Sequence, residues 1–243
     1  MTARVALVTG ASRNIGRSIV LALAADGMDV AINCRRPNDV DAGSLADEVR
    51  RLGRTPLLVS ADVTDRRAVD GMVGLAVDTF GRLDTLVHNA AIRRQRQLVE
   101  ISDAEWQEVT ATILDAAFFC ARAAVPHLLA STAGRLIAIG GVSGHLGAAN
   151  RAHVVAAKAG LAGFVKALAH EFAGRGLTVN CVVPGPIDTI RASDTGSPPG
   201  FRPPVGHEGT PEDIARAVAF LNRPENSFIT GQAMHVNGGT YMP

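Results

Sequence analysis

Short runs of apolar residues recur along the chain and alternate with longer segments in which apolar residues repeat every three or four positions. A short continuous apolar run is typical of a strand covered on both faces, and the longer spacing is typical of a helix with one buried face. The expected strands are residues 5–8, 30–32, 57–59, 83–87, 136–139 and 179–183. Because parallel strands need crossover connections, this alternation predicts an α/β fold of the Rossmann type, a doubly wound parallel sheet with helices on both faces.

One segment near the carboxyl end departs from this alternation. It contains eight residues that break regular structure: Gly196, Pro198, Pro199, Gly200, Pro203, Pro204, Gly206 and Gly209. We therefore expect a loop over residues 191–210, followed by a helix at residues 211–221. Two interpretations of the loop stay open, a disordered connector and a lid over a substrate site.

Length and composition favour one domain that binds a small molecule. The 243 residues show no internal repeat, so residues 1–243 are assigned to a single domain. The net charge is +1, and the chain has one Trp and one Tyr. A neutral chain with so few aromatic residues does not favour binding to nucleic acid or to an anionic membrane.

The cysteines and the amino-terminal segment bear on the compartment. Cys34, Cys120 and Cys181 are far apart and odd in number, which fits a reduced protein better than a disulfide framework. The first residues lack the pattern of a signal peptide, and no run of about 18 apolar residues suggests a membrane span. We expect a cytoplasmic protein with no membrane attachment and no metal site.

Residues 9–16, with the sequence Thr-Gly-Ala-Ser-Arg-Asn-Ile-Gly, follow the first expected strand and open the first expected helix. Backbone N–H groups at a helix start bind phosphate, and glycines there permit a tight turn and close packing of helix on strand. The alternative is an ordinary turn that contains glycine. The phosphate-binding residues would be Gly10, Ser12, Arg13, Asn14, Ile15 and Gly16.

The end of the second expected strand indicates which dinucleotide would bind. Sites for NAD place Asp or Glu there to hold the ribose 2′-hydroxyl, whereas a 2′-phosphate requires cationic groups. Arg35 and Arg36 stand at this point, and Arg13 lies in the glycine turn. The pattern favours NADP(H), although one or two of these arginines would be solvated surface charges in the alternative reading.

Together with Lys158 in a helical segment, these motifs resemble the short-chain dehydrogenase/reductase family, and within it the 3-oxoacyl-carrier-protein reductase type. The resemblance covers nearly the whole chain and implies assembly as a homodimer or homotetramer through helices near residues 116–129 and 152–172. It also implies further cofactor contacts. These would be Asp62 and Val63 at the adenine, Asn89, Ala90 and Ala91 after the fourth strand, and Pro184, Gly185, Ile187 and Thr189 at the nicotinamide.

The resemblance fails where the family places its catalytic residues. The tyrosine that exchanges a proton with the substrate, four residues before the lysine, is Val154 here. The serine that holds the substrate oxygen is replaced by Gly141, and the asparagine that supports a proton-relay water is replaced by Ile113. Only Lys158 remains, and in the family it also binds the nicotinamide ribose. A valine has no proton to give, so any function must be compatible with the missing relay.

Two nearby side chains are candidates to replace the missing groups. Ser143 lies two residues past the expected serine, and a shifted loop would bring its hydroxyl within reach of a substrate. His145 follows the fifth strand and has a side-chain pKa suited to proton donation, although a loop histidine is more often a surface residue.

Four arginines are candidates for binding the substrate. Arg93, Arg94 and Arg96 follow the Asn-Ala-Ala stretch, and Arg151 lies on the helical face of Val154 and Lys158. They would favour an anionic substrate such as a carboxylate, a phosphate or a carrier-linked molecule. A solvated basic loop is the alternative for the first three.

Two functions follow. The first is an atypical NADP(H)-dependent oxidoreductase that acts on a carbonyl, imine or conjugated small molecule without the tyrosine relay. The second is a non-redox protein on the same scaffold, either a cofactor-binding or regulatory subunit or a catalyst of cyclisation, elimination or isomerisation.

Overall fold

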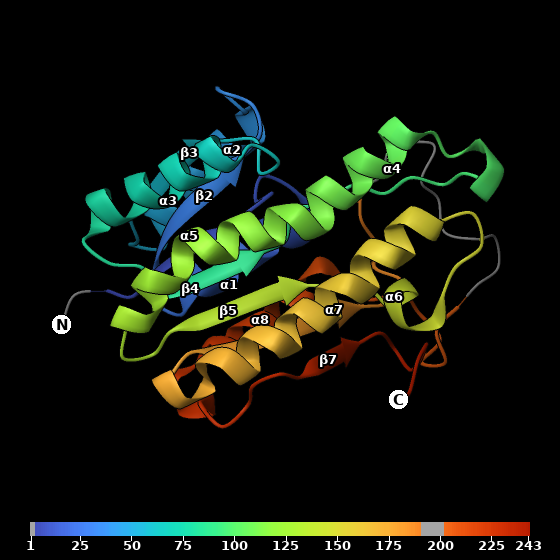
Figure 1. Ribbon diagram of the computed structural model, residues 1–243. Helices are drawn as coiled ribbons and strands as arrows, with labels where there is room; N and C mark the ends of the chain where they lie inside the picture. Colours follow the sequence, from blue (N-terminus) through green and yellow to red (C-terminus); the bar gives the residue numbers. More distant parts are fainter. Residues whose placement is uncertain (1–2, 191–201) are drawn as a thin grey trace.

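Seven parallel strands form one sheet in the order β3-β2-β1-β4-β5-β6-β7 (Figure 1). A computed structural model describes residues 3–190 and 202–243. Residues 191–201 of the expected loop therefore lie outside the described residues. The strands are β1 (Val5–Val8), β2 (Asp29–Cys34), β3 (Pro56–Ser60), β4 (Thr85–His88), β5 (Arg135–Ile139), β6 (Thr178–Pro184) and β7 (Ala233–Val236).

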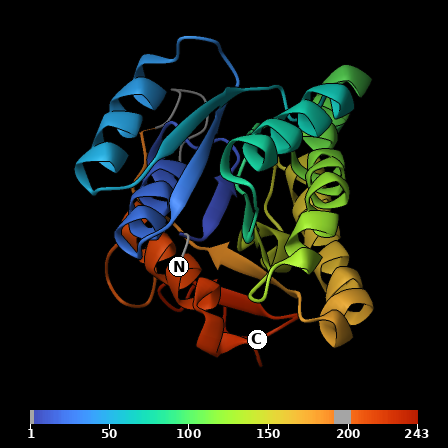
Figure 2. The same ribbon diagram turned by 90° about the vertical axis from the view of Figure 1, so that its left-hand side faces the viewer.

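Helices connect the strands and cover both faces of the sheet (Figure 2). The α-helices are α1 (Asn14–Ala25), α2 (Val40–Arg51), α3 (Arg66–Phe80), α4 (Asp103–Thr110), α5 (Ala116–Ala130), α6 (Ser143–Leu146), α7 (Ala152–Phe172) and α8 (Pro211–Asn222). A π-helical turn, η2 (Ala111–Asp115), joins α4 to α5, and short 3₁₀ turns are η1 (Leu98–Glu100), η3 (Ala173–Arg175) and η4 (Pro224–Asn226). The predicted doubly wound parallel fold is confirmed.

All six expected strands are present, and the apolar runs of β1, β4, β5 and β6 are buried on both faces as expected for parallel strands. The run of β3, at the edge of the sheet, is only partly buried, and Leu58 is exposed. The pattern of apolar runs in the sequence does not predict β7. This strand has only four residues, all half-buried at the edge of the sheet, so no continuous apolar run marks it. The helix expected at residues 211–221 is α8, which begins with a capping box between Thr210 and Asp213.

Two apolar cores lie on opposite faces of the sheet. One core packs α3, α5 and α7 against one face, and the other packs α1, α2 and α8 against the opposite face (Figure 2). Alternate residues of each strand enter alternate cores, as Leu7 and Val8 of β1 do. Because both faces of the sheet are covered, a ligand site is expected at the carboxyl ends of the strands.

Two helical stretches are long and apolar enough to cross a membrane by length and composition alone. They are residues 103–130 and 152–175, and 44% and 33% of their most apolar windows are buried. The sequence analysis expected no such stretch. Core helices of globular domains meet the same criterion, and both stretches here pack on the sheet through α5 and α7.

The strand order changes direction between β1 and β4. The chain runs outward from β1 through β2 and β3, returns to the centre at β4, and continues through β5, β6 and β7 to the other edge. At such a switch point the connections after two neighbouring strands turn to opposite faces and leave a crevice at the carboxyl edge. The fold therefore places the binding cleft above β1 and β4.

A buried carboxylate links the central strands at their amino ends, on the side of the sheet opposite the cleft. Asp84, just before β4, accepts hydrogen bonds from the Val5 backbone N–H at 2.8 Å, from the Arg82 guanidinium at 2.7 and 2.8 Å, and from the Ser131 hydroxyl. Burial would raise the pKa of this carboxyl, but these hydrogen bonds outweigh it and lower the pKa. The ionised form therefore ties β1, β4 and the end of α5 together.

Replacing Asp84 by Asn tests this anchor. We expect D84N to lose roughly 2–4 kcal/mol of unfolding free energy at pH 7, because Arg82 loses its anionic partner in a buried setting. The native pKa is lowered, so the contribution is present above the unfolded pKa and disappears as pH falls through the native pKa. Urea unfolding of both proteins from pH 7 to pH 3 measures this, and an unchanged difference across that range would contradict it.

Candidate active site

A cleft of about 1960 Å³ opens at the carboxyl edge of the sheet above the switch point. Its walls come from the segments that follow β1, β2, β3, β4, β5 and β6 and from the first turns of α7. These segments are distant in sequence and meet only because the carboxyl ends of parallel strands lie together. The cleft contains most of the residues that the sequence analysis assigned to cofactor and substrate.

The glycine turn forms the floor of this cleft. Gly10 has φ +58°, and a Cβ there would lie 2.9 Å from the Cα of Ala90. A Cβ on Gly16 would lie 2.4 Å from the Gly10 carbonyl oxygen, so no side chain fits at this contact of helix and strand. Asn14 has φ +51°, so asparagine holds a left-handed conformation at the position where the turn of the short-chain family, which this chain resembles, has glycine. Arg13 and Ser12 also line the cleft.

Two side chains that the sequence analysis did not single out support this turn. The Thr9 hydroxyl accepts hydrogen bonds from the backbone N–H groups of Asn89 and Ala90 at 3.0 and 3.1 Å. The Asn33 side chain accepts from the Gly10 N–H at 3.2 Å. In return, the Asn89 amide donates to the carbonyl oxygens of Thr9 and Gly10 at 3.0 and 2.9 Å. A polar residue buried at the end of a parallel strand is the signal that could have identified both.

Cationic groups gather at the end of the cleft next to β2. Arg13, Arg35 and Arg36 all line it. Arg35 forms an ion pair of 3.0 Å with Asp62, and Arg13 lies 4.0 Å from Asp41. Burial would raise the pKa of the Asp62 carboxyl, but hydrogen bonds from Thr64 and the charge of Arg35 lower it. Val63 lines the cleft beside Asp62.

The segment after β6 forms the opposite wall. Pro184, Gly185 and Thr189 line the cleft, as do Ala90 and Ala91 after β4. Ile187 is different because its side chain is 2% exposed and packs in the core with residues of α8. Ile15 also lines the cleft. The structure thus gathers the predicted cofactor residues around one cleft, with Ile187 supporting the wall from behind.

Lys158 lies at the centre of the cleft, on α7. Its ammonium donates to the Ile139 carbonyl oxygen at the end of β5 at 2.7 Å. Burial lowers the pKa of this lysine to about 8, and the positive charge of Arg93 lowers it further against the opposing effect of Cys181. Near pH 7 the side chain therefore still carries its charge, but it loses its proton more easily than a lysine in water does.

Of the three positions that the resemblance assigns to the other catalytic residues, 141 and 154 line the same cleft as Lys158, and neither carries a side chain that can give a proton. Val154 lines the cleft and is 5% exposed, because it also packs into the core. A Cβ on Gly141 would enter open space, and its nearest neighbour would be the Ser143 hydroxyl oxygen at 3.9 Å. Ser143 itself lines the cleft. Its hydroxyl therefore lies near the place where a serine at position 141 would carry its own.

Ile113 lies in the π-helical turn η2, and its side chain is completely buried. Its carbonyl oxygen lies 3.2 Å from Nε2 of His88, the last residue of β4. Burial lowers the pKa of His88 to about 4, and the charge of Lys158 lowers it further, so the imidazole is neutral near pH 7. A carbonyl accepts only, so Nε2 carries the proton. His88 thus donates a hydrogen bond to a backbone carbonyl of the π-helical turn η2.

The four arginines assigned to the substrate divide into two groups. Arg93, Arg94 and Arg151 line the cleft, and Arg151 donates to the Gln95 side chain at 3.4 Å. Arg94 also pairs with Glu108 at 3.0 Å. Arg96 does not line the cleft and instead pairs with Glu105 at 3.0 Å on α4.

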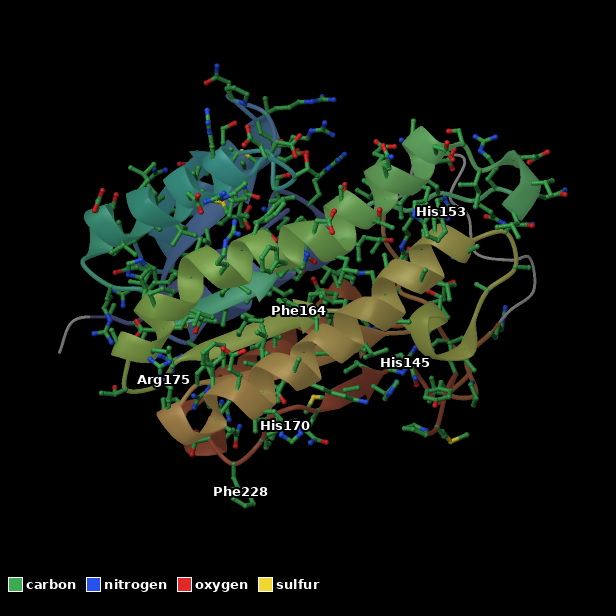
Figure 3. All side chains as sticks on the ribbon, viewed as in Figure 1. His145, His153, Phe164, His170, Arg175 and Phe228 are labelled. Carbon is green, nitrogen blue, oxygen red and sulfur yellow. The ribbon has the colours of Figure 1, made fainter. Side chains whose placement is uncertain are left out.

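His145 and His153 do not line the cleft. The His145 ring lies 4.7 Å from that of His235 and 5.7 Å from that of Tyr241. His153 is fully buried, with Nε2 3.2 Å from the Glu105 carboxylate. Figure 3 shows His153 beside α4 and His145 on α6, on the other side of α7. The structure thus does not bring His145 to Lys158. Among the described residues, no group of three or more His, Cys, Asp or Glu side chains could hold a metal ion.

Comparison with known proteins identifies the family. A family model described as Enoyl-(Acyl carrier protein) reductase matches residues 10–241. The chain is 41% identical over 241 residues to the 3-oxoacyl-[acyl-carrier-protein] reductase FabG of Staphylococcus aureus, and 40% identical over 243 residues to that of Escherichia coli, with 98% of each chain covered. It also resembles the crystal structure of a candidate short-chain alcohol dehydrogenase from Sinorhizobium meliloti, with a TM-score of 0.90, 30% identity, and coverage of 98% of this chain and 96% of that one. The chain belongs to the short-chain dehydrogenase/reductase family, a family of oxidoreductases.

The lowered pKa of Lys158 has a consequence for stability. Between the native pKa of about 8 and the reference value of 10.5, Lys158 binds a proton in the unfolded chain but not in the native one, so its own contribution to the unfolding free energy should rise with pH in that window. We expect K158M to lack this rise, which amounts to roughly 1–3 kcal/mol. The buried thiols of Cys120 and Cys181, whose pKa is raised, contribute a fall that K158M should retain. Urea unfolding of the ligand-free proteins at pH 7 to 10.5 measures it.

Lys166, an exposed lysine further along α7, gives the control. K166M should keep the rise seen in the natural protein. An equal rise in K158M and the natural protein would show that the Lys158 ammonium is not destabilised by burial.

Proposed function

We propose that the protein is an atypical NADP(H)-dependent oxidoreductase that transfers hydride to or from a carbonyl, imine or conjugated small molecule without a tyrosine-based proton relay. The observation that carries this proposal is the contrast within one cleft. The cradle for a dinucleotide is built from tightly packed residues, whereas Gly141 and Val154 line the cleft at two of the positions for proton transfer and Ile113, at the third, is buried in the core.

The residues present fit a bound dinucleotide. The turn at Gly10 and Gly16 excludes side chains and leaves the start of α1 open to a pyrophosphate. Lys158 would hold the nicotinamide ribose, and the segment from Pro184 to Thr189 would contact the nicotinamide. Arg13, Arg35 and Arg36 would hold a 2′-phosphate, which supports NADP(H) over NAD(H). When bound, the cofactor supplies or accepts the hydride.

The chain's own groups would then orient the substrate rather than protonate it. Ser143 would donate a hydrogen bond to the substrate oxygen from beside Gly141. Arg93 and Arg151 would favour an anionic substrate. Loss of a positioned general acid typically costs about 10²–10⁴ in rate. A cationic acceptor such as an iminium, or protonation by water, would avoid much of this cost.

A non-redox role is the second candidate, and the three simultaneous replacements favour it. Ile113 and Val154 are buried parts of the apolar core, so the relay is not merely rewired at one position. A cofactor-binding or regulatory subunit, or a catalyst of cyclisation, elimination or isomerisation, would use the cleft for its shape. Such a protein would keep NADP(H) as a structural ligand.

Assembly and location follow the family pattern in our proposal. A homodimer or homotetramer would form through α5 and α7, whose apolar windows are only partly buried within one chain. Phe118 of α5 is 44% exposed, with the Arg122 guanidinium 4.7 Å from its ring centre. The three cysteines are free and buried, which supports the reducing cytoplasm as the compartment.

Binding of the two nicotinamide cofactors tests the arginine site. We expect NADPH to bind more tightly than NADH, and R36A to weaken NADPH at least about tenfold with little change for NADH, because a charged hydrogen bond is lost. Titration followed by nicotinamide fluorescence measures both. R51A, which removes an exposed arginine on α2, is the matched control. Equal affinities for NADPH and NADH, or no binding of either, would contradict the cofactor assignment.

Restoring the missing hydroxyl groups separates the two candidate functions. The double variant G141S/V154Y should gain reduction of a simple 3-oxo ester by NADPH, by about 10²-fold or more over the natural protein, because a proton donor returns. A Cβ at position 141 meets nothing closer than 3.9 Å, so the serine fits. Stopped-flow loss of NADPH absorbance measures the gain, and V154F is the control for size without a hydroxyl. No gain in a folded variant that binds NADPH would favour the non-redox role.

A further inference from the structure

Asn14 occupies a position in the phosphate-binding turn where the short-chain pattern has glycine. Its φ of +51° is the left-handed conformation for which glycine is the usual choice. The other non-glycine residues with positive φ in the described part of the chain are Asn38 and Asn150, so asparagine takes this role throughout. Backbone geometry alone does not explain why a side chain replaces glycine at the cleft floor.

The Asn14 side chain makes two hydrogen bonds to one distant residue. Its Nδ2 donates to the Ile190 carbonyl oxygen at 3.0 Å, and its Oδ1 accepts from the Ile190 N–H at 3.0 Å. Both polar backbone groups of Ile190 are thus satisfied by one amide side chain. The pair joins residues 176 positions apart, and both lie on the lining of the cleft.

The segment that Asn14 holds is the one after β6. Its first part is fixed by Gly209, because the Asp188 N–H donates to the Gly209 carbonyl at 2.8 Å and the Gly209 N–H donates to the Pro186 carbonyl at 3.0 Å. Ile190, two residues beyond Asp188, is attached to the Asn14 side chain. The wall of the cleft at Thr189 is therefore held between an attachment to the α8 side and an attachment to the phosphate-binding turn.

We propose that Asn14 retains the cofactor, because its amide fastens the loop at Ile190 to the turn that binds the pyrophosphate and must release it before NADP(H) leaves. This inference rests on the proposed cofactor site. It assigns Asn14 to a role that glycine cannot perform. The attachment would connect the loop at the nicotinamide end of the cleft to the turn at the pyrophosphate end. Because it would have to break before bound NADP(H) can leave, it would slow dissociation more than association.

The two hydrogen bonds between Asn14 and Ile190 determine which variants test the attachment. Asn14→Gly keeps the left-handed turn without strain and removes both hydrogen bonds. Asn14→Asp keeps the size and the acceptor for the Ile190 N–H, but a carboxylate cannot donate to the Ile190 carbonyl. Glu212→Ala is the matched control, since it removes a different contact of α1, the hydrogen bond of 2.9 Å from Ser18 to Glu212, and leaves the two hydrogen bonds of the Asn14 side chain in place.

Hydrogen exchange of the ligand-free proteins tests the attachment without the cofactor. In N14G the Ile190 amide should exchange about five- to tenfold faster than in the natural protein, as expected for the loss of two exposed hydrogen bonds. N14D should be intermediate and E212A unchanged. Mass spectrometry of a peptide spanning residues 187–190 measures this. Equal exchange in N14G and the natural protein would overturn the proposal.

Release of NADPH, measured by stopped-flow dilution into excess unlabelled NADP⁺ with nicotinamide fluorescence as the signal, tests the function. N14G should release NADPH about three- to tenfold faster with little change in the association rate, and E212A should match the natural protein. Faster amide exchange with unchanged release would overturn retention while leaving the cofactor site intact. Failure of the natural protein to bind NADPH would refute the proposed cofactor site, and retention with it, while the exchange data would still report whether the attachment exists.

Discussion

The close contact between β1 and β4 is the constraint on which the rest of the site depends. The Gly10 turn has room for no side chain against Ala90 or against the start of α1. The Asn89 amide and the Thr9 hydroxyl then join the two strand ends by four hydrogen bonds, at 2.9 to 3.1 Å. Because these bonds fix the crevice at the switch point, the backbone N–H groups at the start of α1 are held toward the cleft before any ligand arrives, which reduces the entropy that a ligand must overcome.

The residues that form this close contact belong to different strands and helices from the positions where the family carries its proton-transfer residues. The strands β1 and β4 and the helix α1 form the dinucleotide cradle, whereas positions 113, 141 and 154 belong to η2, the end of β5 and α7. In our proposal, the absence of the relay residues therefore leaves the cradle for NADP(H) intact. Ile113 and Val154 extend the core that α5 and α7 share, where burial of apolar surface is favourable. His88 completes the polar bonding of η2, where an unbonded carbonyl would be costly.

The sequence predicted the strands and helices that have a repeating apolar pattern of their own. It did not predict the features whose position depends on contacts between distant parts of the chain. Periodicity predicted six strands and α8, because each element has its own buried face. It missed β7, whose place comes from its pairing with β6 rather than from its composition. The glycine turn and the arginines near β2 were predicted because chain direction alone brings strand ends together. The direction of His145 toward His235 and Tyr241, and the pairing of Arg96 with Glu105, depend on how α6 and α4 pack. No local pattern encodes these contacts.

The charge of Lys158 links the two halves of the cleft. Burial brings its pKa to about 8, so near neutral pH the ammonium is only modestly favoured over the neutral amine. An anionic group bound nearby would stabilise the ammonium, and by thermodynamic linkage the ammonium would strengthen binding of that group by the same free energy. The charge of Arg93 acts in the opposite sense and weakens the ammonium. A ligand that neutralises Arg93 would therefore raise the pKa of Lys158 and keep its ammonium charged over a wider pH range.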